Sequence, residues 1–387
     1  MHKVNLIALL ILFAGCSSES SQIQFESLLD SEWSKIVKDN PIYASSMGDL
    51  TQNTEWSDTS VKNIYSDHQH QLEVLNQLDQ LDLSNFTEDN KVNYSLFKQQ
   101  YENSIESHAY KTFLIPFSHR GGIQLQHETT SIVPLRNKQH YFDWIERISK
   151  IDVLVDAAIE KGKIGIAEEI VPPRFLMQKV YKQIELQAFV EPRDSPFYRV
   201  FLEMDRSIDS IETEEIQQKA LNVIKLKVIP AYVKLHRFFK DEYLPACRTS
   251  IGIKEIKNGK EYYEFLARKF TTTNLTPKEI HEIGLSEVAR IRGEMDAIIE
   301  EVKWEGTFKS FLDDLRTNPK FYYETSEELF ESYLATSKRI DPELVKLFKV
   351  LPSMPYGLKP IPMESAPDTT TAYYQRPAAD GSRAGYY

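Results

Sequence analysis

The chain has 387 residues, and its 57 acidic residues outnumber its 46 basic residues, which gives a formal net charge of -11 at pH 7. This surplus of negative charge argues against nucleic acid and anionic lipid as partners, and we expect no nucleic-acid partner. With 41% hydrophobic residues the chain can bury a core, and its two cysteines are too few for a disulfide framework.

Residues 1–15 have the pattern of an export signal that ends before a lipidated cysteine. A charged start is followed by an apolar run from Val4 to Ala14, which is too short to span a membrane. Small residues directly before Cys16 give lipoprotein signal peptidase access to the bond that it cleaves. We therefore expect a lipoprotein signal peptide over residues 1–15, a lipid on Cys16, and a polar tether over residues 16–24.

This assignment predicts a lipid-anchored protein of the cell envelope. Removal of residues 1–15 takes away one lysine and no acidic residue, so the formal charge of the mature chain becomes -12. Ser17, in place of an aspartate after the cysteine, favours sorting to the outer membrane, where we expect the protein to face the periplasm. Because Cys16 is acylated, Cys247 has no disulfide partner, and we expect it to be a buried structural thiol.

Apolar residues recur at helical spacing over most of the chain, which predicts a mainly α fold. The first stripe runs from Phe25 to the helix-stopping pair Asn40-Pro41, and further stripes cover 64–78, 97–105, 141–159 and 176–188. Another helix is predicted from Ile216 to Tyr243, with a kink or break because Pro230 lacks a backbone donor. We expect residues 25–387 to form one helical domain.

Two later helices have strong start signals. Thr276 and Glu279 form a capping box around Pro277, and apolar residues then continue at helical spacing as far as Val302. Residues 325–328 form a second capping box, and Asp341-Pro342 opens a short helix. The sequence therefore predicts a long amphipathic helix from Pro277 and a shorter one from Ser326.

The pattern changes after Leu351, where frequent prolines exclude a long helix. We expect a strand over 369–374, a turn at Asp380-Gly381 and a returning strand over 384–387, which together form a hairpin. The sequence stops within that last strand, where backbone groups need partners. We therefore expect this polypeptide to be the front part of a longer protein, with a helical domain that is incomplete at its C-terminal end.

No catalytic motif emerges from the residues themselves. The zinc-peptidase pattern H-E-x-x-H needs two histidines four residues apart, and neither His127-Glu128 nor His281-Glu282 supplies the second one. We interpret His281 as a structural helix residue. His68 and His70 are separated by about 200° around a helix and are interpreted as ordinary surface and core histidines. The residues predict a helix-rich, anchored domain with no assigned catalytic or metal-binding residue.

Two stretches resemble a known bacterial family, "domain of unknown function 885". The first is Phe270–Leu285 with the residues that follow it as far as Met295, and the second is Tyr373-Tyr374, Pro377 and the segment from Asp380 to Tyr387. That family typically begins behind an export or lipoprotein signal and opens with helices like those from Phe25 onward. The resemblance covers essentially the whole mature chain.

The resemblance implies a mainly α, zinc-peptidase-like fold of the gluzincin type, with a small β-hairpin near the C-terminal end of this chain. In such folds an edge strand before the catalytic helix holds extended substrate. The family's metal motif, H-E-G-x-P-G-H-H, is expected after the strand where this sequence stops. No catalytic or metal residue can therefore be carried over, and zinc is expected only in the full-length family protein.

Three residues near the C-terminus are candidates for substrate binding. Arg383 could pair with a substrate carboxylate, while Tyr374 and Tyr387 could line a cleft or donate to an oxyanion. The alternative is an arginine that stabilises the turn and tyrosines that pack.

The leading hypothesis from the sequence is the N-terminal part of an anchored, zinc-peptidase-like hydrolase of peptides, which is inactive without the missing metal motif. The alternative is a non-catalytic helical lipoprotein that binds a peptide or another envelope component.

Overall fold

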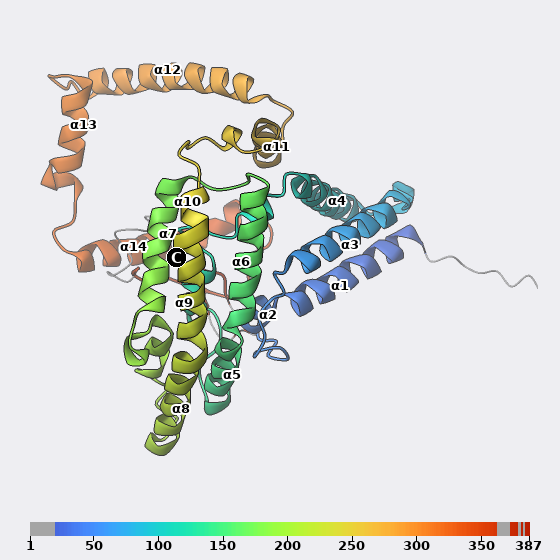
Figure 1. Cartoon of the computed structure of the whole chain (residues 1–387). Coiled ribbons are helices and arrows are strands. Elements are labelled where there is room, and N and C mark those ends of the chain that lie inside the picture. The colour runs from blue at the N-terminus through green and yellow to red at the C-terminus, as the bar shows by residue number, and fades with distance from the viewer. Residues whose placement is uncertain (1–19, 362–371, 378–380, 382–383) are drawn as a thin grey trace, which may run out of the picture.

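A computed structural model describes residues 20–361, 372–377, 381 and 384–387, and these residues are mainly helical. Figure 1 shows an upright bundle of helices, from which three N-terminal helices extend to one side. The predicted mainly α class is confirmed. The segment assigned to the signal peptide and to Cys16 lies outside the described residues.

The three N-terminal helices are α1 (Ser21–Asp39), α3 (Val61–Asp79) and α4 (Glu88–Ala109), with the short α2 (Pro41–Ser46) after α1. Each of the three begins where a side-chain oxygen of Ser20, Ser60 or Thr87 accepts from a backbone amide one turn later. In both views α3 lies between α1 and α4. The three helices and the short η1 (Leu83–Asn85) surround a small core of their own, formed by Phe25, Val74, Leu78, Phe86, Tyr94 and Tyr101.

The upright bundle contains the larger core. Its helices are α5 (Lys138–Ser149), α6 (Ile151–Ala167), α7 (Arg174–Ala188), α8 (Ser210–Val223) and α9 (Ile229–Phe238). The single stripe predicted over 141–159 is divided between α5 and α6. Connecting 3₁₀ segments are η2 (Thr112–Leu114), η3 (Ile123–Ser131), η4 (Pro192–Asp194) and η5 (Pro196–Phe201). Large side chains, Trp144, Phe197 and Tyr232 among them, fill the interior.

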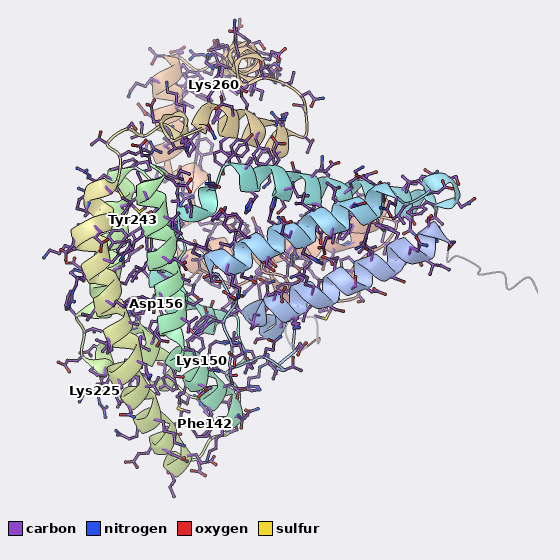
Figure 2. The ribbon with its side chains drawn as sticks, turned by 45° about the vertical axis from the view of Figure 1, so that its right-hand side comes forward. Phe142, Lys150, Asp156, Lys225, Tyr243 and Lys260 are labelled. Carbon is purple, nitrogen blue, oxygen red and sulfur yellow. The ribbon has the colours of Figure 1, made fainter. Side chains whose placement is uncertain are left out.

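The interruption predicted near Pro230 takes the form of a π-helical segment. The π segment η6 (Ile224–Val228) precedes Pro230, and a second one, η7 (Phe239–Tyr243), precedes Pro245 in α10 (Leu244–Ala246). Lys225 and Tyr243, which Figure 2 labels, lie in the first and second π segments. Because a proline has no amide hydrogen to donate, the widened turn lets the helix continue without a break.

The remaining helices are α11 (Gly259–Thr271), preceded by η8 (Ile253–Glu255), then α12 (Pro277–Glu301), α13 (Phe308–Thr317) and α14 (Ser326–Ile340), with η9 (Pro319–Phe321) and η10 (Asp341–Lys346) around α14. Both predicted capping boxes are present, at Thr276–Glu279 and Thr325–Glu328. We refer to residues 277–351 as the C-terminal arm, and Figure 1 shows α12 above the bundle and α13 descending on the left. No residue of this arm is buried.

The predicted hairpin is only partly correct. Gln375 and Tyr386 form one antiparallel bridge, but the described residues 372–374 are not a strand. Instead β2 (Gly385–Tyr386) pairs in parallel with β1 (Tyr356–Gly357), a partner that the sequence did not indicate. This pairing could not be predicted, because a two-residue strand is too short to show an alternating pattern. The frequent prolines between the two segments also gave no sign of a strand there.

Candidate functional site

A cavity of about 880 Å³ opens among α1, α3 and α4 and reaches Lys269 on α11. Cavities of this size accommodate small ligands and peptide segments. Its lining combines charged side chains of both signs, side-chain amides, hydroxyls and three histidines with the apolar side chains of two isoleucines and a phenylalanine. The lining residues are Glu32, Lys35, Ile36, Asp39, Asn40, Ile64, Asp67, His68, His70, Gln71, Gln100, Tyr101, Asn103, Ser104, Ser107, His108, Thr112, Phe113 and Lys269.

At one wall of the cavity a buried carboxylate joins the three helices. Glu32 on α1 is only 5% exposed. His70 on α3 lies with Nε2 at 2.8 and 3.0 Å from its two carboxylate oxygens, and the Tyr101 hydroxyl on α4 donates to it at 2.5 Å. Burial and the hydrogen bond to Glu32 raise the pKa of Tyr101 well above its usual range. The carboxylate is therefore fully partnered, as a buried charge must be.

A second ionic group lies on the same side of α1. Lys35 forms ion pairs with Asp39, one turn further along α1, and with Asp67 of α3, whose nearest oxygen is 3.1 Å away. Asn63 also donates to Asp67 at 3.0 Å. Burial alone would lower the pKa of Lys35, but the hydrogen bonds to both aspartates raise it above its ordinary value. Lys35 is thus held as a cation at the cavity surface.

Stacked rings form another wall. The imidazoles of His68 and His108 lie parallel with centroids 3.8 Å apart, and Phe113 stacks on His108 at 5.1 Å. Burial lowers the pKa of His108, and the neighbouring His68 and Lys111 lower it further. The buried Nδ1 of His68 has no hydrogen-bond partner in the described part of the chain. This wall therefore presents the faces of stacked rings together with the Nδ1 of His68, which lacks a hydrogen-bond partner among the described residues.

His68 and His70, which the sequence analysis interpreted as ordinary surface and core histidines, both line this cavity. They do point apart on α3, but α3 lies between α1 and α4, so both reach the cavity. Glu32 and Tyr101 were also missed as site residues. One signal was available for Glu32, because it falls between Leu29 and Ile36 on the apolar stripe of α1, where a carboxylate needs a buried partner.

The three predicted substrate-binding residues are not brought to this cavity. Tyr374 and Tyr387 are not among its lining residues, and both are about half exposed near the short sheet. The ring of Tyr387 lies 6.5 Å from that of Tyr333 on α14. Arg383 lies outside the described residues. Their role in substrate binding remains a prediction.

The described residues do not fit a zinc ion. Nowhere in the described ranges do three His, Cys, Asp or Glu side chains group so that they could hold a metal. His281 lies exposed on α12. Cys247 is buried, and burial raises the pKa of its thiol to about 12, which fits the structural role predicted for it. We derive no catalytic step through zinc.

The other near match to the zinc motif, His127, is partly buried against the bundle. Its Nδ1 accepts a hydrogen bond from the Gln187 amide at 3.0 Å, and its ring contacts Phe197 edge to face. Burial, and then the charge of Arg199, lowers the pKa of His127 to about 4. The imidazole is therefore neutral in the folded protein at pH 7.

This depressed pKa predicts a loss of stability in mild acid. The unfolded chain takes up a proton near pH 6.5, whereas folded His127 does so only near pH 4, so stability falls as pH decreases through that interval. We expect the free energy of unfolding to fall by about 2 kcal/mol more in the parent than in His127→Gln between pH 7 and pH 4.5. Urea unfolding at both pH values measures this difference. Equal losses in the two proteins would contradict the prediction.

The fold and the cavity together define an α-helical protein with a pocket between its N-terminal helices. In the described part of the chain no helix has both the length and the apolar content that crossing a membrane requires. The chain belongs to the family described as bacterial protein of unknown function, DUF885, whose profile matches residues 41–387. This match confirms the family resemblance stated above.

One solved structure shows the same fold. It is described as "the crystal structure of the putative lipoprotein from Colwellia psychrerythraea" and superimposes with a TM-score of 0.82 at 22% sequence identity. The superposition covers 95% of this chain and 67% of that chain. A search of curated proteins finds no match.

Proposed function

We propose that this protein is a lipid-anchored component of the cell envelope that binds a peptide in the cavity among α1, α3 and α4. The observation that carries the proposal is the cavity itself, about 880 Å³ in volume and lined by amides, hydroxyls and charges of both signs. Such a lining complements a polypeptide, which presents backbone donors and acceptors together with charged ends.

Each part of the lining has a counterpart in a peptide. Asn103, Gln71 and Ser107 offer hydrogen-bonding groups to backbone amides. Lys269 offers a cation to a carboxylate. Because Glu32 and the aspartates are already paired within the wall, the cavity keeps its shape when empty, and this lowers the entropic cost of binding.

The anchor is proposed from the N-terminal sequence. The signal pattern before Cys16 supports lipidation there, and the protein from Colwellia psychrerythraea with the same fold is described as a putative lipoprotein. We propose the periplasmic side of the outer membrane as the location. The formal charge of -11 supports a partner other than nucleic acid.

We further propose, from the family resemblance, that a longer gene product hydrolyses the bound peptide within a gluzincin-type architecture. Its zinc ligands would lie past Tyr387, and Arg383, Tyr374 and Tyr387 would contact substrate there. An in-frame H-E-G-x-P-G-H-H past codon 387, with bound zinc and peptide turnover by that product, is the expected result. A longer product that holds no zinc and cleaves no peptide would refute the hydrolase proposal, and peptide binding without hydrolysis would then be the proposed function.

Peptide binding is tested by filling the cavity. We expect Ser107→Trp, on the cavity side of α4, to weaken binding of a fluorescein-labelled peptide mixture by about tenfold or more, because the indole occupies the space of the ligand. Fluorescence polarisation with residues 16–387 measures the affinity.

Ser95→Trp is the matched control, since Ser95 is exposed on the same helix and does not line the cavity. Its affinity is expected to equal that of the parent. Equal affinities for all three proteins would place the peptide elsewhere, and a parent chain that binds no peptide would refute the proposal.

A further inference from the structure

Helix α12 has a continuous apolar stripe that nothing in the described residues buries. The stripe consists of apolar residues at alternating intervals of three and four, namely Val288, Ile291, Met295, Ile298 and Val302. Their exposed fractions range from 40% for Ile291 to 67% for Val288. Alternating threes and fours are the spacing of a helix that packs along its length against another helix.

The polar side of α12 needs no further partner. Arg290 pairs with Glu287 and Glu294, and Arg292 pairs with Asp296, all within α12. These pairs lie along the surface of an isolated helix, where they contribute little stability. The apolar stripe therefore has to be covered for α12 to be stable, because helices of this kind owe their stability mainly to packing.

We propose that a helix of the polypeptide following Tyr387 in a longer gene product covers this stripe. The solved chain with the same fold includes about a third of its length that has no counterpart here, whereas 95% of this chain is matched. The stripe from Val288 to Val302 is about 21 Å long, which a partner helix of about four turns covers. The proposal does not depend on peptide binding in the cavity.

A second copy of this chain fits the surface less well. The arm exposes more apolar side chains beyond α12, among them Leu347 and Val350, each more than four-fifths exposed. A two-fold contact through α12 alone would leave these uncovered. Several elements of additional polypeptide can cover both regions.

The test compares residues 16–387 with the longer product. Reading the gene past codon 387 is expected to show an open frame, and hydrogen exchange at the amides of 288–302 is expected to be about tenfold slower in the longer product. Ile291→Glu should remove that slowing, because it places a charge in the covered stripe. Ala289→Glu adds the same charge on the opposite face of α12, so the slower hydrogen exchange of the longer product should be retained in this variant.

The shorter chain shows whether the substitution itself disturbs folding. Ile291 is exposed in residues 16–387, so Ile291→Glu should leave the helical circular dichroism of that shorter chain unchanged. Ile291→Ala provides a milder variant of the longer product. A stop codon directly after codon 387, or equal exchange rates in the two lengths, would overturn the proposal. A dimer of residues 16–387 in light scattering that Ile291→Glu dissociates would assign the stripe to a second copy.

Discussion

Replacing Glu32 with alanine is expected to lower the free energy of unfolding by about 3 kcal/mol, because it removes the shared partner of two side chains in the cavity wall. His70 and the Tyr101 hydroxyl would both lose their acceptor. Tyr101 is only 8% exposed, so water replaces little of the hydrogen bonding that its hydroxyl loses. Urea unfolding of residues 16–387 at pH 7 measures the change.

Two further variants show whether the loss comes from this network. Tyr101→Phe removes one hydrogen bond to the carboxylate and is expected to cost about 2 kcal/mol, less than Glu32→Ala. Glu73→Ala removes an exposed carboxylate from α3 and is expected to change stability by less than about 0.5 kcal/mol. A loss for Glu32→Ala no larger than that for Glu73→Ala would show that the network contributes no stability.

The second large effect is expected at Gly165, where α6 passes close to other backbone. A Cβ added there would lie 2.7 Å from the carbonyl oxygen of Leu114 and 2.9 Å from that of Ile170. Both contacts are with backbone atoms, which cannot move aside as a flexible side chain does. We expect Gly165→Ala to destabilise the protein by about 3 kcal/mol, although alanine is the better helix former.

Gly293→Ala is the matched control for this prediction. Gly293 also lies within a helix, α12, but a Cβ there has no atom within 4 Å. The same substitution should therefore raise the free energy of unfolding by about 0.5–1 kcal/mol, through helix propensity alone. Thermal and urea unfolding compare the two variants, and a shift of the same sign in both would contradict the packing argument.

Helix starts were predictable from sequence because the interactions that make them are local. The capping box at Thr276 joins residues only three positions apart, and the box at Thr325 has the same spacing. Pro230 likewise acts on its own helix turn, so an interruption there could be expected, although its π-helical form could not. Apolar periodicity located α1, α3 and α7, since each buries part of one face.

The cavity could not be predicted in this way. Glu32 and His70 are 38 positions apart, and Glu32 and Tyr101 are 69 apart, so no local pattern links them. The sequence drew attention to Arg383, Tyr374 and Tyr387, which family resemblance and residue type favoured. The parallel pairing of β1 with β2 was also missed, because the two strands are far apart in the sequence and a proline-rich stretch separates them.

By itself the sequence determined a mainly helical chain, the starts of the two helices that open with capping boxes, and the family to which it belongs. Only the tertiary structure decided that α3 lies between α1 and α4, which brings His68 and His70 to one cavity although they diverge on their helix. The physical reason is that caps and apolar spacing act within about one turn of chain, whereas a binding site depends on how whole helices pack together.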